Sequence, residues 1–204
     1  FIRKLLSSIA GIGIAAGLAI SANADEITIA TVNNNDMIVM QKLAPKWEAA
    51  TGHKINWVVL EENVLRQRTT QDISTGGGSF DIMFIGAYET PIWGANGWLT
   101  SLDDFYDDAD YDANDIFQLV RNGLSANGSL YAVPLYSETS FTFYRTDVFE
   151  KAGVAVPTEQ VTYTEFADMV SKLHDPDNGM YGTCQRGKAG WGENMAFIGP
   201  LANA

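Results

Sequence analysis

The segment Tyr131–Phe149, "YAVPLYSETSFTFYRTDVF", raises the main question about how this chain is organised. Its two ends predict β-strands, "LYAV" at 130–133 and "SFTFYR" at 140–145. Between them lie Pro134 and the polar run "YSET", which carries Glu138 and contains no glycine. Proline keeps the residue before it extended, and without glycine a tight turn is disfavoured. The pattern therefore predicts an extended, polar interruption of an apolar run.

The residues before this segment begin with a strand and a helix. "EITIATV" (Glu26–Val32) predicts a strand, and apolar residues at helical spacing predict a helix that ends at Gly52. Asp36 precedes the first of these apolar residues, so we expect it to cap the helix. Pro45 falls inside the helical pattern and predicts a kink or a restart there.

The same alternation continues beyond this helix. A second strand is expected at Lys54–Glu61, a helix capped by Asn63 runs to about Thr75, and Phe80–Ile85 predicts a third strand. Near-continuous apolar strands alternating with helices favour a parallel sheet in an α/β fold. Ligands bind outside the carboxyl ends of such strands. The residues predicted at these ends are polar or aromatic: Asn33–Asp36, Glu61–Glu62 and Gly86–Glu89.

The later part of the chain gives more local signals. Asn127–Gly128 predicts a turn, and Thr162 with Glu165 predicts a capping box for a helix from about Tyr163 to His174. "MYGTCQ" at 180–185 predicts a short strand.

The N-terminus is typical of an export signal. Arg3 and Lys4 precede an apolar run rich in glycine and alanine from Leu5 to Ile20, which is followed by Ala22-Asn23-Ala24. This order predicts a secretory signal peptide at residues 1–24, cleaved before Asp25. The run is shorter than the roughly 20 residues that span a bilayer, which disfavours a membrane anchor. Because the chain starts at Phe1 and ends within a predicted helix, we expect a piece of a longer precursor.

Charge and cysteine content restrict the function classes. The net charge is −12, and removal of Arg3 and Lys4 with the leader makes it more negative. Such a chain is repelled by nucleic acid phosphates and anionic membranes, so we expect no nucleic acid partner. With one cysteine, Cys184, no internal disulfide can form.

Motifs for metals, phosphates and catalysis fail in their details. "DADYDAN" (108–114) begins like a calcium loop, but Ala113 and Leu119 occupy the places that need glycine and a bidentate glutamate. The "TGGGS" run lacks the Lys-Ser/Thr ending of a phosphate loop. Glu61 and Glu62 are adjacent, so on a strand they point to opposite faces and cannot flank one bond. We expect no metal, no cofactor and no catalytic residue.

The remaining candidates are aromatic and hydrogen-bonding side chains near strand ends. Aromatic faces stack on the C–H surfaces of sugars and polyols, and hydroxyl groups need paired donors and acceptors. Trp93 and Trp191 could instead belong to the core. The candidates are Tyr88, Glu89, Trp93, Tyr136, Glu138, Arg186, Trp191 and Glu193.

The sequence resembles a known family over all of the residues after the leader. It is similar to the periplasmic substrate-binding proteins of ABC importers, in the extracellular solute-binding group that takes maltodextrins and other sugars. The stretches that carry the resemblance are "LAPKWEAATGHKINWV", "TGGGSFDIMFIGAYE", "GWLTSLDDF" and "YAVPLYSETSFTFYRTDVFEKAGVAVP". Within the group, the chain looks most like the sorbitol/mannitol-type binders.

The resemblance implies a two-lobed α/β fold that closes over its ligand. It implies a first lobe at residues 25–135, a hinge crossing at 136–139 and the start of a second lobe at 140–204, which is incomplete because members are roughly twice this length. The interrupted run around Pro134 is then the point where the chain crosses from the first lobe to the second.

The resemblance also implies contacts for the ligand. Residues after the first strand (Asn34, Asn35, Asp36), Glu61 after the second, and Tyr88 with Glu89 after the third match places where relatives bond ligand hydroxyls. Glu138 matches a hinge carboxylate. Arg186, Trp191 and Glu193 fall where the second lobe contributes contacts.

The expected function is binding of a sugar or sugar alcohol in the periplasm and its delivery to the permease subunits of an ABC importer. The full-length protein is expected to be a monomer and not an enzyme. An exported carbohydrate-active enzyme is one alternative. The same fold with a peptide, an anion or a metal as ligand is another, although anions fit poorly with the negative charge.

Overall fold

The computed structural model describes residues 25–108, 110–139 and 141–202. Its centre is a parallel three-stranded sheet in the order β2-β1-β3, which confirms the predicted α/β arrangement. The predicted signal peptide lies outside the described residues. The strands are β1 (Glu26–Val32), β2 (Lys54–Leu60) and β3 (Ile82–Met83), joined by helices α1 (Asn35–Thr51) and α2 (Glu62–Thr75).

The first two helices begin at caps that differ from the predicted ones. Asn34, not Asp36, caps α1 by accepting a hydrogen bond from the Met37 amide at 2.9 Å. Glu61, not Asn63, caps α2 by accepting from two amides of its first turn. A cap must precede the free N–H groups of the first turn, and each predicted cap is already inside its helix.

Helix α1 ends as predicted, at Gly52 with φ of 78°. It also continues through Pro45, so the restart predicted there is wrong. Pro45 is exposed, and the carbonyl left without its helical partner can bond to water on that face.

The core of the sheet fixes where its carboxyl edge lies. Ala30 and Leu65 are fully buried and pack with Val32, Met37 and Phe80. The cluster joins the end of β1 to the first turns of α1 and α2. Burial of these apolar groups therefore holds both helix caps beside one another at the same edge.

A second group of short elements follows β3. It contains α3 (Glu89–Ala95), α4 (Asp103–Tyr106), η1 (Ala113–Asp115), α5 (Gln118–Gly123), β4 (Ser125–Ala126) and β5 (Ser129–Leu130). The predicted turn at Asn127–Gly128 is confirmed, because both residues have positive φ between antiparallel β4 and β5. The ring of Tyr131 packs against Gly94 so closely that a Cβ there would lie 2.5 Å from it.

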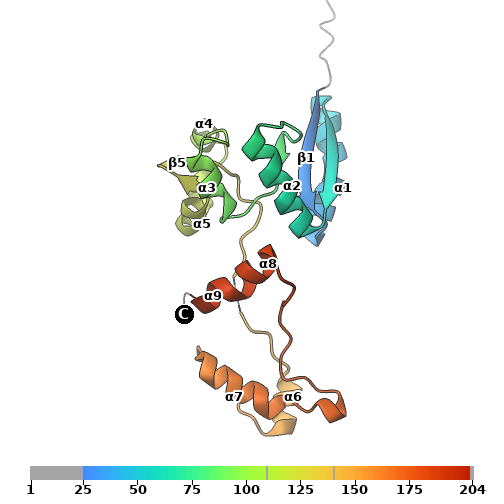
Figure 1. The fold of residues 1–204 in the computed structure, drawn as a ribbon, viewed down its shortest axis with the longest axis vertical. Coiled ribbons are helices and arrows are strands. Elements are labelled where there is room, and N and C mark those ends of the chain that lie inside the picture. Colours follow the sequence, from blue (N-terminus) through green and yellow to red (C-terminus); the bar gives the residue numbers. More distant parts are fainter. Residues whose placement is uncertain (1–24, 109, 140, 203–204) are drawn as a thin grey trace, which may run out of the picture.

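The segment around Pro134 contains no regular structure. Strand β5 ends at Leu130, and residues 131–139 and 141–145 form neither helix nor strand, so the strands predicted at 130–133 and 140–145 are wrong. A strand needs a partner, and among the described residues no strand pairs with 131–133 or 141–145. The chain instead runs extended out of the sheet region (Figure 1).

Beyond this segment the chain is mainly helical. The elements are α6 (Thr146–Ala152), α7 (Tyr163–Leu173), η2 (Pro176–Asn178), α8 (Trp191–Glu193), the π-helical turn η3 (Asn194–Ile198) and α9 (Gly199–Ala202). The capping box of Thr162 and Glu165 is confirmed. The strand predicted at 180–185 is wrong, because only Met180 makes a bridge, with Asp175.

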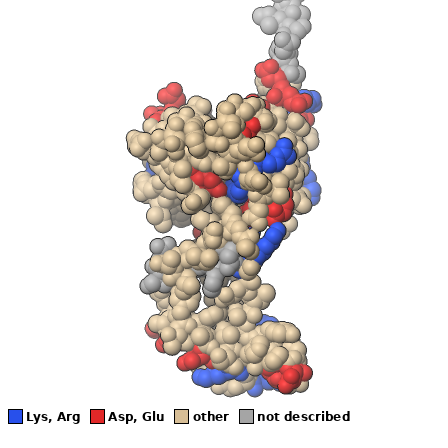
Figure 2. Space-filling view, viewed as in Figure 1, with Lys and Arg blue, Asp and Glu red and all other residues tan. Residues whose placement is uncertain are grey.

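The elements form two bodies. We call residues 25–130 the sheet body and residues 146–178 the helical body; Figure 1 shows α8 and α9 between them, next to the sheet body. On the face drawn in Figure 2, Lys and Arg side chains are dispersed rather than gathered into a continuous basic surface. Among the described residues, no helix has both the length and the apolar character needed to cross a bilayer.

Large apolar side chains are exposed to solvent on both bodies and between them. Phe117 is 79% exposed, Leu119 is 83% exposed and Phe143 is 87% exposed. Phe141 and Phe143 contact each other, with ring centroids 4.7 Å apart, but both remain exposed. Exposed apolar patches of this kind drive association.

We therefore expect residues 25–204, produced alone, to self-associate. Size-exclusion chromatography with light scattering should give a mass above the monomer, and a dye for apolar surface should bind. Phe143→Ser should lower both signals, whereas Thr158→Ser, an exposed polar exchange, should change neither. A monomeric peak with a cooperative thermal transition would contradict the prediction.

Candidate functional site

Polar side chains gather at the carboxyl edge of the sheet, as the parallel arrangement requires. Asn34 follows β1, and its Nδ2 donates a hydrogen bond to the hydroxyl oxygen of Tyr136 at 3.0 Å. The Tyr136 ring also lies against Phe84, which follows β3, with centroids 5.9 Å apart. Through these two contacts the extended segment after Pro134 is held against the end of the sheet.

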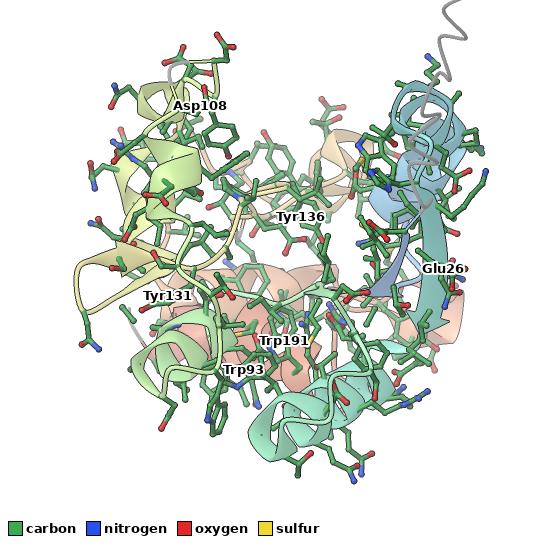
Figure 3. All side chains as sticks on the ribbon, turned by 90° about the horizontal axis from the view of Figure 1, so that it is seen from above. Glu26, Trp93, Asp108, Tyr131, Tyr136 and Trp191 are labelled. Carbon is green, nitrogen blue, oxygen red and sulfur yellow. The ribbon has the colours of Figure 1, made fainter. Side chains whose placement is uncertain are left out.

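The surroundings of Tyr136 keep its hydroxyl protonated. Partial burial, and then the charge of Glu138, raise the pKa of Tyr136 above its ordinary value. The oxygen accepts from Asn34, so its proton remains available to an acceptor on a ligand. Figure 3 shows Tyr136 and Trp191 in the middle of the molecule, whereas Glu26 and Asp108 lie at its periphery.

A buried ion pair lies behind this edge. Glu89 is 5% exposed and accepts a hydrogen bond from the Gly86 amide at 3.0 Å. Its other oxygen lies 3.8 Å from Nε of Arg66, whose Nη1 donates to the Phe84 carbonyl at 2.8 Å. Glu89 is thus held by groups of the protein, and Arg66, which sequence reasoning missed, ties α2 to the end of β3.

Trp191 covers this ion pair. The guanidinium of Arg66 stacks on the indole, 4.2 Å from the ring centroid. A Cβ at Gly86 would lie 2.6 Å from a ring carbon, so the absence of a side chain there permits the approach. The indole Nε1 is buried and has no hydrogen-bond partner among the described residues. Trp191 therefore packs over the end of β3, and its indole N–H donates to no described residue.

The residues just before Trp191 bind the start of α2. Asn63 donates to the Ala189 carbonyl at 3.3 Å and accepts from the Trp191 amide at 3.2 Å. Lys188 Nζ lies 2.6 Å from Glu61 Oε1. Hydrogen bonding from Lys188 is the main reason that the pKa of Glu61 is held below its usual range.

Arg186 makes a second ion pair with the same helix. It binds Glu62, whose other oxygen lies 3.7 Å from Nη2 of Arg66. A Cβ at Gly192 would collide with the Arg186 guanidinium, so that glycine leaves room for it. Lys188 joins Arg66 among the residues of this edge that sequence reasoning missed, whereas Glu62 and Gly86 were expected only as strand-end residues and Asn63 only as a cap.

The other predicted residues occupy varied places. Asn35, Asp36 and Glu138 are exposed near the sheet edge, and Tyr88 is 60% exposed just before α3. Trp93 is 4% exposed, inside α3, in the position expected of a core residue. The side chain of Glu193 lies outside the described residues.

The edge therefore offers donors, acceptors and aromatic faces. Within the described parts of the chain, no group of three or more His, Cys, Asp or Glu side chains could hold a metal. Two open hollows lie elsewhere, one of about 220 Å³ at the end of α2 and one of about 440 Å³ beside α7, and neither is lined by a predicted site residue. The chemistry at the edge suits recognition of a neutral, hydroxyl-rich molecule.

Comparison with known proteins defines the class of protein. The profile of the bacterial extracellular solute-binding protein family matches residues 33–204, so the chain belongs to this family. The two-lobed α/β fold predicted from the sequence is the fold of its structural relatives.

Three relatives are named for, or were solved with, a sugar alcohol. A mannitol-binding protein of Pseudomonas aeruginosa is 53% identical over 91% of this chain and 42% of its own length. An ABC transporter solute-binding protein of Agrobacterium vitis, solved with bound D-mannitol, is 51% identical with a TM-score of 0.80, over 88% of this chain and 43% of that one. A ribitol complex from Agrobacterium radiobacter is 27% identical with a TM-score of 0.62, over 76% and 39%. The chain thus spans about two fifths of the length of these relatives.

Removal of the buried cation should destabilise the sheet body. Arg66→Met leaves the carboxylate of Glu89 buried without its positive partner, and such a loss costs about 3 kcal/mol of unfolding free energy. Denaturant unfolding of the gene product that contains this chain measures the change. Arg68→Met, on an exposed position of the same helix, is the matched control and should change it by less than about 0.5 kcal/mol. Equal effects of the two variants would show that the pair is unimportant.

Proposed function

We propose that this protein binds a sugar alcohol outside the cytoplasm, as the binding component of an ABC importer, and that mannitol or a close relative is the ligand. The observation that carries the proposal is the 53% identity to a mannitol-binding protein over 91% of the chain. The donors, acceptors and aromatic faces at the sheet edge support it, because they match the needs of a polyol.

The proposed mechanism is closure of two lobes over the ligand. Residues 25–135 form the first lobe, 136–139 the hinge crossing and 140–204 part of the second lobe. A ligand that contacts both lobes favours the closed state by its differential affinity for that state. The extended conformation after Pro134 suits a crossing, because no sheet ladder has to break when the chain bends there.

The proposed contacts divide by chemistry. Tyr136 and Asn34 offer a hydroxyl and an amide at the point where the crossing meets the sheet. Trp191 is half-buried and offers the part of its aromatic surface that Arg66 does not cover. Each ligand hydroxyl buried without a partner costs about 1–3 kcal/mol, so this arrangement can distinguish stereoisomers of one polyol.

The carboxylates of the site disfavour an enzyme. Glycoside hydrolysis needs two carboxyl groups on either side of one bond. Glu61, Glu62 and Glu89 are instead each paired with a cation of the protein. The relatives are named as binding proteins, in keeping with this assignment.

Location and partners follow from the same proposal. We propose export to the periplasm through a leader at residues 1–24 and delivery of the ligand, as a monomer, to the permease subunits of the importer. The family name places its members outside the cell membrane.

Titration of the complete gene product with D-mannitol, sorbitol, ribitol and erythritol tests the proposal. Tryptophan fluorescence should change on binding, because Trp191 lies at the site, and calorimetry should give the highest affinity for a hexitol. Glucose and a phosphorylated hexitol serve as controls for ring form and for charge. The absence of binding to all four polyols would overturn the proposal.

Removal of its hydroxyl group tests the proposed role of Tyr136. Tyr136→Phe removes the acceptor of the Asn34 amide and the donor offered to the ligand, so the Kd for mannitol should rise at least about fivefold. Tyr163→Phe, on the exposed start of α7, is the matched control and should leave the Kd unchanged. An unchanged Kd in Tyr136→Phe would remove this residue from the site.

A further inference from the structure

The segment 186–191 and the first turn of α2 form a contact between parts of the chain that are far apart in sequence. We call it the docking contact and define it by Glu61, Glu62, Asn63 and Arg66 on one side and Arg186, Lys188, Ala189 and Trp191 on the other. It joins the sheet body to the segment that leads away from the helical body (Figure 1).

We propose that Glu61 and Glu62 strengthen ligand binding without contacting the ligand, by pairing with Lys188 and Arg186 across the two proposed lobes. They are thus positioning residues that favour the closed arrangement. The inference rests on the proposed function, and it assigns to Glu61 and Arg186 a role different from the direct ligand contacts expected from the sequence.

The engagement of the carboxylate oxygens supports this role. One oxygen of Glu61 accepts from the Asn63 and Val64 amides, and the other accepts from Lys188. One oxygen of Glu62 accepts from Arg186, and the other faces Arg66. Every oxygen of the two side chains thus has a partner within the protein, and the partners Lys188 and Arg186 tie the segment 186–191 to the first turn of α2.

The effect on ligand affinity follows from linkage. Pairs that span the two lobes form fully only when the lobes are close, so they raise the fraction of the protein in the closed state. The apparent Kd equals the intrinsic Kd divided by the fraction that is competent to bind. Stronger docking therefore tightens binding even though the polyol touches none of these charges.

Salt provides a signature of this role. A polyol is uncharged, so its own contacts are nearly independent of ionic strength. Ion pairs between exposed groups weaken as salt screens them. Lys188 is 72% exposed and Arg186 is 54% exposed, so each pair is accessible to screening. If these pairs hold the lobes together, the affinity for a neutral ligand falls as salt rises.

Substitutions on the segment side test the proposal without disturbing the cap of α2. In the complete gene product, Lys188→Met and Arg186→Met should each raise the Kd for D-mannitol about two- to fivefold at low salt. The double variant should lose most of the salt dependence. Lys172→Met, an exposed lysine in the last turn of α7, is the matched control and should behave as wild type.

A double-mutant cycle identifies the partner. Glu61→Gln should weaken binding in the wild-type background and have little further effect once Lys188 is methionine. Additive effects, or a salt dependence that the variants retain, would overturn the proposal. Thermal unfolding of each variant checks that the fold is intact.

A measurement without ligand separates this proposal from the proposed function. Small-angle scattering of the ligand-free protein should show a larger radius of gyration for the Lys188→Met/Arg186→Met variant than for wild type. If wild type binds no polyol, the proposed function fails, while the scattering result still decides the role of the docking contact. Equal radii would overturn that role.

Discussion

The parallel pairing of β1 with both β2 and β3 is the constraint on which the rest of the structure depends. Val32 pairs with Leu60 and Ala30 with Met83, so all three strands run in one direction and end at one edge. Asn34, Glu61 and Phe84 leave the sheet there. Everything proposed about binding, from the Tyr136 contact to the docking of 186–191, uses this edge.

The buried charge of Arg66 imposes a second constraint on that edge. A cation buried to this degree is costly unless charges and carbonyls surround it. Here the surroundings come from four separate places in the chain: Glu62, the Phe84 carbonyl, Glu89 and the face of Trp191. The charge of Arg66 therefore fixes the relative positions of these four groups as well as contributing stability. If any of them moved away, part of the charge would be left uncompensated.

The sequence predicted the features that depend on neighbouring residues. The bounds of β1, the end of α1 at Gly52, the turn at Asn127–Gly128 and the capping box of Thr162 all arise from local patterns. Its failures have non-local causes or involve adjacent polar residues. Asn34 and Asp36 both suit a cap, and only the backbone path selects between them. The Arg186–Glu62 pair joins residues 124 positions apart, beyond the reach of any spacing rule. Residues 141–145 have strand composition, but no strand in the described part of the chain pairs with them. Which of the predicted side chains contact a ligand depends on the remaining surfaces of the binding site and stays a prediction.

The hydrogen bond between Asn34 and Tyr136 has a mechanical consequence. It fastens the chain to the sheet body two residues before Glu138, which is exposed. In the proposed closure, the rotation would therefore occur after Tyr136, where residues 137–139 and 141–145 belong to no helix or strand. In the proposed closure, Tyr136 would stay with the sheet body and Glu138 would move relative to it. The distance between these two side chains would then report how far the proposed closure has gone.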